Sequence, residues 1–116
     1  MSKLLGSKVV LEQLKVINSL GKTNRWSLQP LATNNGSSYL TAKYQLKTFK
    51  TTWKFLNEVA KTADELRHHP TIETTYNKID IKLTTHDEEN HVTELDLELA
   101  KAIEEIYTTK FDKSAS

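Results

Sequence analysis

Apolar residues recur with two different periods along this chain. Over 7–20, 48–66 and 93–108 they return every three or four residues, which places them on one face of an α-helix. Over 24–46 and 73–85 the chain contains runs in which apolar and polar residues alternate, as in strands with one buried face. The pattern therefore predicts the order helix, two strands, helix, two strands, helix.

The ends of the expected helices carry residues with known end preferences. Thr48 is a suitable N-cap for the second helix, and Gly21 suits the end of the first. Pro70 stops the second helix, because the residue before a proline is steered away from helical dihedral angles. Thr93 followed by Asp96 is a variant of the capping box, with aspartate in place of the usual glutamate. These residues predict where the helices begin and end.

Two pairs of extended segments lie between the helices. A cluster that contains Asn-Gly separates the first pair, which predicts a β-hairpin. A tight turn separates the second pair, with one long bent strand as the alternative. The segments are, in order, 24–32, the turn 33–37, 40–46, 73–76, the turn Asn77-Lys78, and 79–85. We expect an α+β fold, a two-layer sandwich in which three helices cover one face of a four-stranded antiparallel sheet, in the order α-β-β-α-β-β-α.

The totals exclude several classes of protein. At 116 residues the chain has the size of one domain, and we expect a core of about 7–108 followed by a tail over 109–116. The net charge of +1 gives no reason to expect direct nucleic-acid binding, and no apolar run approaches the ~20 residues that cross a membrane. The chain has no cysteine and no recognisable signal peptide, which fits a cytoplasmic location and excludes thiolate chemistry.

Three of the four histidines lie between residues 68 and 86. His68 and His69 are expected where the second helix turns into a strand, and His86 at the end of the last strand. Histidine suits general acid–base catalysis because its unperturbed pKa is ~6.5. Two other interpretations remain open: a His-His pair alone is usually only a helix-end feature, and these residues with Asp87 form a candidate metal set. The metal set is disfavoured because adjacent side chains on an extended backbone point apart.

The spacing of these residues resembles the signature of the pterin-4a-carbinolamine dehydratase family. That signature consists of Asp64, His68-His69-Pro70, Tyr76, His86 and Asp96. The similarity extends upstream to Trp26 and to the passage 44–49, so it covers roughly 14–106. The chain departs from the family pattern at Ile72, where the family usually has tryptophan, and at Thr74, where it usually has asparagine.

The resemblance implies a hydro-lyase that needs no metal and no cofactor. Its substrate would be 4a-hydroxytetrahydrobiopterin, which loses water to give the quinonoid dihydropterin during tetrahydrobiopterin recycling. His68 and His86 would act as acids toward the departing hydroxyl, and His69 would bind or exchange the N5 proton. The implied substrate-binding residues are His68, His69, Pro70, Thr85, His86, Asp87 and Glu88. Two carboxylates are supporting candidates: Asp64, one helical turn before His68, could orient its ring, and for Asp96 helix capping is favoured over a direct role in the site.

The resemblance also implies assembly, and two alternative functions accompany it. We expect a homodimer, or a homotetramer that pairs through the second helix, and no membrane partner. Animal members double as dimerisation cofactors of a homeodomain transcription factor, so one alternative is a non-catalytic oligomerisation module with a protein partner, located in the nucleus as well. The apolar stripe of the second helix consists of Trp53, Leu56, Val59, Ala60, Ala63 and Leu66, and we expect it to be buried in the core. A subunit contact is the other interpretation of this stripe, and Trp53, Leu56, Ala60 and Ala63 would then serve the oligomerisation role. The other alternative is a dehydratase for another pterin, such as one on the molybdenum cofactor route, because Ile72 and Thr74 alter the family pattern.

Overall fold

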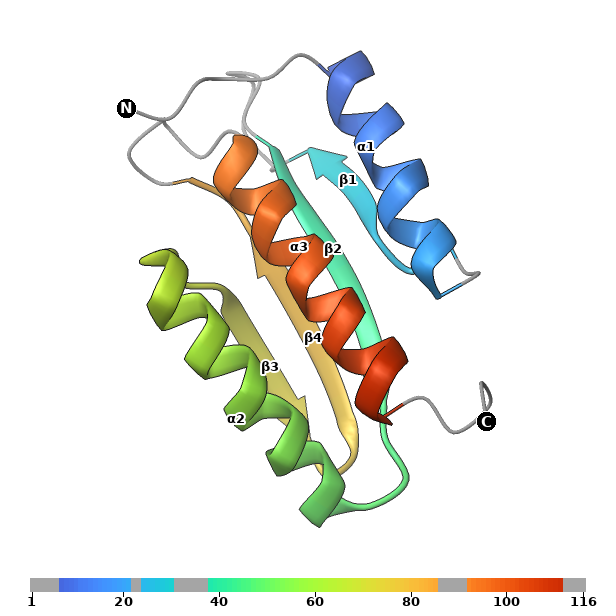
Figure 1. The fold of residues 1–116 in the computed structure, drawn as a ribbon, viewed down its shortest axis with the longest axis vertical. Helices are drawn as coiled ribbons and strands as arrows, with labels where there is room; N and C mark the ends of the chain where they lie inside the picture. The colour runs from blue at the N-terminus through green and yellow to red at the C-terminus, as the bar shows by residue number, and fades with distance from the viewer. Residues whose placement is uncertain (1–6, 22–23, 31–37, 86–91, 112–116) are drawn as a thin grey trace.

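The helices and strands of the protein follow the predicted order (Figure 1). A computed structural model describes residues 7–21, 24–30, 38–85 and 92–111. Its elements are α1 (Ser7–Leu20), β1 (Ser27–Pro30), β2 (Ser38–Gln45), α2 (Phe49–Leu66), β3 (Thr71–Thr75), β4 (Lys78–Leu83), α3 (Glu94–Ile106) and the π-helical turn η2 (Tyr107–Phe111). The first two helices end where the apolar pattern placed their ends.

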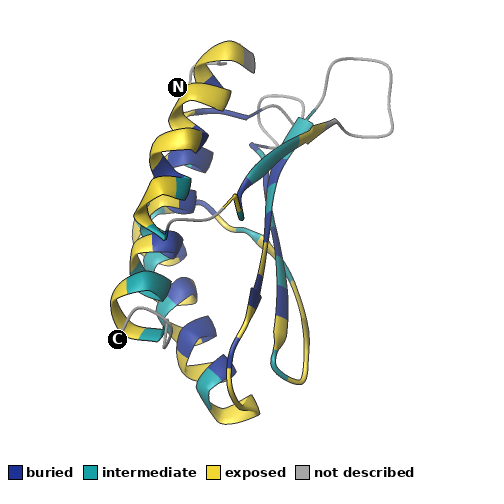
Figure 2. Cartoon of the chain, turned by 90° about the vertical axis from the view of Figure 1, so that its right-hand side faces the viewer, coloured by how far each residue is buried: buried dark blue, intermediate teal, exposed yellow. Residues whose placement is uncertain are grey.

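The strands form one antiparallel sheet in the order β1-β2-β4-β3. The helices α1, α2 and α3 lie together on one face of this sheet, and Figure 2 shows the two layers from the side. The predicted α+β two-layer sandwich is therefore confirmed. The strands β2 and β4 come from different hairpins and become neighbours at the centre of the sheet.

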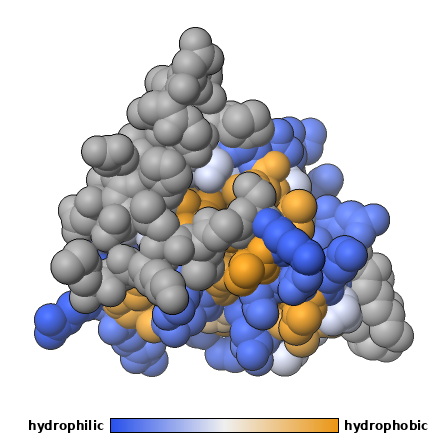
Figure 3. Space-filling model, turned by 90° about the horizontal axis from the view of Figure 1, so that it is seen from above, coloured by the Kyte–Doolittle hydropathy of each residue, from blue (hydrophilic) through white to orange (hydrophobic). Residues whose placement is uncertain are grey.

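The buried face of the sheet is built from alternate residues of its two central strands. The buried pairs are Leu40 with Leu83, Ala42 with Ile81, and Tyr44 with Ile79. On the opposite face Lys43 pairs with Asp80, which pairs in turn with Glu73. The period of two thus separates an apolar core from a charged open face. Seen along the long axis, apolar residues gather between hydrophilic ones (Figure 3).

The buried stripe of α2 is narrower than the sequence pattern predicted. Its buried members are Thr52, Phe55, Leu56, Val59 and Ala63. Trp53 and Ala60 instead face outward, and Trp53 is 44% exposed. Each residue turns about 100° around a helix axis, so these two positions lie beside the buried line rather than on it. The rings of Trp53 and Phe49 form an edge-to-face pair on the outside of α2, with their centroids 6.3 Å apart.

The turn between β3 and β4 lies one residue earlier than predicted. It consists of Tyr76 and Asn77, and Tyr76 has a φ of 55°. The Asn77 side-chain amide donates to the carbonyl oxygen of Leu46 at 2.8 Å, and the Leu46 N–H donates to the carbonyl oxygen of Asn77 at 2.9 Å. These bonds tie the tip of the hairpin to the end of β2. The turn is therefore placed by a contact with a distant segment, and the alternative of one long bent strand is wrong.

Packed structure continues past the predicted end of the core near residue 108. The Phe111 ring lies 5.5 Å from the ring of Phe55, measured between centroids. Lys110 Nζ lies 2.8 Å from Glu58 Oε1. Both contacts join the turn η2 to α2, so the first residues assigned to the tail belong to the packed fold. The turn cluster predicted at 33–37 lies outside the described residues.

Candidate active site

The end of α2 turns His68 toward the interior. Arg67, the residue after the helix, has left-handed backbone angles of φ 55° and ψ 39°. The Arg67 N–H donates to the Asp64 carbonyl at 3.1 Å, and the His68 N–H donates to the Ala63 carbonyl at 3.0 Å. This bond pattern is the Schellman motif, which folds the following residue back over the helix end. His68 is accordingly buried, with 9% of its surface exposed.

The imidazole of His68 meets a buried carboxylate on another helix. Asp96 lies in the first turn of α3 and is 0% exposed. Its Oδ1 lies 2.5 Å from His68 Nε2. A carboxylate removed from water needs donors to replace its hydration, and the start of a helix is a favourable place for negative charge. Asp96 therefore takes part in the capping box of α3 and also contacts the ring of His68. The capping that the sequence favoured is present, and a role of Asp96 in the site stays a prediction.

Two threonines complete the surroundings of Asp96. The Thr85 hydroxyl donates to Asp96 Oδ2 at 2.8 Å, and the Thr93 backbone N–H donates to the same oxygen at 2.8 Å. The two hydroxyls lie 2.7 Å apart. Thr85 follows β4 and Thr93 precedes α3, while His68 follows α2. The site thus stands where the ends of three elements meet.

The other predicted site residues have different surroundings. His69 is exposed and Pro70 is half-buried, whereas His68 is buried, so the two adjacent histidines differ in their access to solvent. Asp64 has an exposed side chain, and the ring of His68 contacts Asp96 instead. The carboxylate that the His68 ring contacts is therefore on α3, and the orienting role of Asp64 stays a prediction. The hydroxyl of Thr85 is directed to Asp96 rather than left open for a ligand.

Several predicted residues lie outside the described part of the chain. His86, Asp87 and Glu88 belong to the segment 86–91, so their roles stay predictions. Among the described residues, no group of three or more histidine, aspartate and glutamate side chains is arranged to hold a metal ion. The rival metal set includes His86 and Asp87 and thus stays untested. No helix in the described ranges has the length and apolar character to span a membrane.

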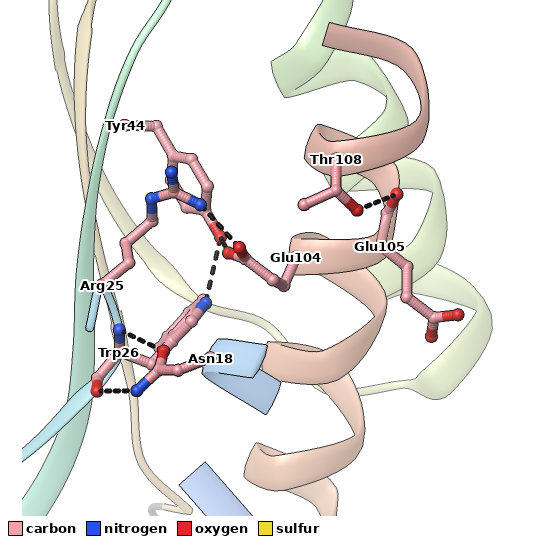
Figure 4. Close-up of polar contacts among 7 residues, drawn as sticks. All are labelled: Asn18, Arg25, Trp26, Tyr44, Glu104, Glu105 and Thr108. Carbon is pink, nitrogen blue, oxygen red and sulfur yellow. Dashed lines mark hydrogen bonds and ion pairs between the residues drawn. The ribbon is translucent and has the colours of Figure 1, made fainter. Parts of the chain in front are cut away.

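A second buried polar network lies further along α3 (Figure 4). Glu104 is 0% exposed; it accepts from Arg25 Nη1 at 2.6 Å and from the Tyr44 hydroxyl at 2.6 Å. The Trp26 indole N–H donates to the Tyr44 oxygen at 3.0 Å. Burial, reinforced by the charge of Glu104, raises the pKa of Tyr44 far above its ordinary value. A side chain at Gly21 would collide with the Glu104 carboxylate, so the glycine leaves room for this network.

The sequence pattern did not reveal these two networks, although one signal was present. Asp96, Ala100 and Glu104 follow one another at four-residue steps on the buried side of α3. Two carboxylates on an apolar helix face need buried partners, because an unpaired buried charge is costly. Among the described residues, every buried side-chain nitrogen and oxygen has a hydrogen-bond partner. The spacing could have predicted buried partners, but not which residues they are.

Fold and site together define a class: a two-layer α+β protein that holds a histidine against a buried aspartate where helix and strand ends meet. The family model described as Pterin 4 alpha carbinolamine dehydratase matches residues 10–106. The chain belongs to this family, which confirms the resemblance drawn from the histidine signature.

Known proteins that resemble the chain agree with this assignment. A protein of Sulfurisphaera tokodaii, provisionally named pterin-4-alpha-carbinolamine dehydratase, is 36% identical over 98 residues, which cover 84% of this chain and 97% of the relative. A protein of Aquifex aeolicus with the same name is 40% identical over 68 residues, covering 59% of this chain and 68% of the relative. The crystal structure of a "transcriptional coactivator/pterin dehydratase" from Brucella melitensis superimposes with a TM-score of 0.71 at 30% identity, covering 90% of this chain and 98% of that one.

Proposed function

We propose that this protein is a 4a-hydroxytetrahydrobiopterin dehydratase, a hydro-lyase of tetrahydrobiopterin recycling. The observation that carries the proposal is the buried contact between His68 and Asp96. It supports the proposal because His68, which precedes His69 in the sequence, has its imidazole against a carboxylate in a chain that belongs to the pterin dehydratase family. Membership in the family supplies the substrate class.

The proposed reaction consists of two proton transfers. The C4a–O bond of the carbinolamine breaks, and the hydroxyl leaves as water with a proton from a histidine. The lone pair of N5 forms the C4a=N5 double bond, the N5 proton passes to a base, and the electrons of the N5–H bond stay on N5 as its new lone pair. Each positioned proton-transfer group typically contributes roughly 10²–10⁴-fold to the rate. Histidines are suited to both transfers because their ordinary pKa lies near neutrality.

The histidines have separate roles in this proposal. Because Asp96 holds Nε2 of His68, Nδ1 is the nitrogen left to give its proton to the hydroxyl. His86 is the second acid, and the exposed His69 receives the N5 proton. The proposed substrate contacts are His68, His69, Pro70, Thr85, His86, Asp87 and Glu88. Thr85 contributes through its backbone, because its hydroxyl is taken by Asp96.

We expect the purified protein to accelerate the dehydration of freshly generated 4a-carbinolamine, followed as the absorbance change of quinonoid dihydropterin formation. The same quantity of heat-unfolded protein is the control, because it contains the same histidines without their arrangement. A rate equal to that in buffer would contradict the proposal. Repeating the assay with pterins that carry different side chains tests the alternative that the substrate is another pterin. That alternative is suggested by Ile72, which departs from the family pattern and packs against the core.

We propose in addition that a second copy of the chain covers the outer face of α2. The supporting observation is the ring pair of Phe49 and Trp53, which are 54% and 44% exposed. Aromatic side chains of this size are enriched at the centres of protein interfaces. The Brucella melitensis protein is described as a transcriptional coactivator as well as a pterin dehydratase, so a protein partner on this face is the alternative, non-catalytic function.

Trp53→Glu is expected to lower the molar mass of the protein in solution to that of a smaller assembly, measured by light scattering after gel filtration. A charge at the centre of an apolar interface loses its hydration without gaining a partner. Val16→Glu is the matched control: Val16 is an exposed apolar residue of α1, and this variant should keep the wild-type mass. If both variants match the wild type, or the wild type is monomeric, the proposed interface is wrong.

A further inference from the structure

We propose that Thr85 and Thr93 are positioning residues that select Nδ1 of His68 as the proton-transferring nitrogen, acting through Asp96. This inference rests on the proposed function for its catalytic consequence. Its structural part concerns only which nitrogen of His68 carries the fixed proton. It assigns a purpose to two buried hydroxyls that the dehydration chemistry itself does not use.

The direction of each hydrogen bond follows from counting protons. A threonine hydroxyl has one proton, and that of Thr85 is donated to Asp96 Oδ2. The 2.7 Å contact between the two hydroxyls can then form only if Thr93 donates and Thr85 accepts. The Thr93 backbone N–H also donates to Oδ2. Asp96 Oδ2 is therefore occupied by two donors, and Oδ1 is left for His68 Nε2.

The consequence for His68 is a fixed tautomer. An ionised carboxylate has no proton to give, so the 2.5 Å contact requires a proton on Nε2. When the ring transfers a proton, it must therefore transfer the one on Nδ1 and remain as the neutral Nε2–H form. If the Asp96 carboxylate were free to move away from Nε2, either ring nitrogen could carry the remaining proton. The two threonines hold the carboxylate against Nε2 through the bonds to its other oxygen, Oδ2.

Burial makes this arrangement rigid. Thr93 and Asp96 are 0% exposed, Thr85 is 5% exposed and His68 is 9% exposed. Water has little access to replace a lost hydrogen bond, and hydrogen bonds are stronger in a protein interior because its dielectric constant is low. A hydrogen bond to a charged group contributes more than one between neutral groups, so a single missing hydroxyl is expected to have a measurable effect. The Thr93 hydroxyl contacts the Thr85 hydroxyl, which in turn donates to Asp96, so the Thr93 hydroxyl is expected to affect His68 less.

Thr85→Val tests the proposal by two measurements. Nitrogen-15 NMR of the His68 ring reports the fraction of Nε2–H tautomer, and steady-state kinetics report kcat and KM. We expect the Nε2–H fraction to fall and kcat to drop about tenfold, with KM within about twofold, because the hydroxyl acts on a proton transfer and not on substrate binding. Thr85→Ser retains the hydroxyl and should restore both values. Thr93→Val retains the backbone N–H to Asp96 and should give a smaller change of the same kind.

Thr52→Val is the matched control. Thr52 is 0% exposed, and its hydroxyl donates to the Thr48 carbonyl at 2.7 Å in the first turn of α2. This variant removes a buried threonine hydroxyl away from His68, so neither the tautomer nor kcat should change. An unchanged tautomer in both Thr85→Val and Thr93→Val would overturn the proposal, whatever the activity. A changed tautomer in a protein without dehydratase activity would support the positioning and contradict the proposed function instead.

Discussion

His68→Gln is expected to lower kcat for carbinolamine dehydration by roughly 10²–10⁴-fold while the protein stays folded. In the wild-type protein, His68 Nε2 lies 2.5 Å from the Asp96 carboxylate. The side-chain amide of glutamine can donate to the same carboxylate, so the buried charge keeps a hydrogen-bond partner. The glutamine side chain has no group that exchanges a proton near neutral pH, so acid catalysis at position 68 is lost. Initial rates at saturating substrate measure the effect, and thermal unfolding verifies the fold.

The role of Asp96 is separated from that of His68 by a double-variant cycle. Asp96→Asn alone should also lower kcat, because the carboxylate that holds the ring is gone. Combined with His68→Gln, the same change should cost little more, since Asp96 is proposed to act through His68. Equal losses in both backgrounds would contradict this dependence. Glu98→Gln is the control, because Glu98 is an exposed carboxylate on the same helix.

Arg25→Met is expected to lower the free energy of unfolding by about 3–5 kcal/mol, measured by urea denaturation. The change removes the cation that lies 2.6 Å from Glu104 and leaves a carboxylate with 0% exposure. Only the Tyr44 hydroxyl, at 2.6 Å, would still donate to it among the described residues. The guanidinium also lies 4.6 Å from the ring centroids of both Tyr44 and Tyr107, so these contacts are lost as well.

Adding Glu104→Gln to Arg25→Met should restore part of the lost stability. The neutral amide no longer leaves an uncompensated charge in the interior, so the double variant should be more stable than Arg25→Met alone. A double variant at least as unstable would show that the charge of Glu104 is not the cause. Lys110→Met is the control for removing a surface cation. Its ion pair with Glu58 is largely exposed, with side chains 56% and 39% accessible, so stability should match the wild type within error.

The candidate site could be predicted only in part, because local spacing identifies residues but not their partners. Pro70 correctly signalled the end of α2, and the pair His68-His69 was correctly placed at that end. The inward turn of His68 depends on left-handed backbone angles at Arg67, and an arginine gives no signal for them, unlike the glycine usual at such positions. The same reliance on spacing favoured Asp64 as the orienting carboxylate, four residues before His68.

The strands show a similar division. Their alternation predicted which residues of β2 and β4 are buried, because side chains of a strand point alternately to its two faces. It could not place the turn at Tyr76 and Asn77, since that turn is held by bonds to Leu46 at the end of another strand. Likewise, helical spacing assigned Trp53 to the buried stripe. Its outward position depends on how α2 packs against its neighbours.

The sequence by itself determined the element order, the α+β class and the family, because periodicity, end signals and motif spacing are properties of short or fixed stretches of chain. Only the tertiary structure decided which charges meet: His68 with Asp96 across 28 positions, and Arg25 with Glu104 across 79. Such pairs depend on how α3 packs on the sheet and against α2. A buried carboxylate requires a partner, and the fold determines which residue can reach it.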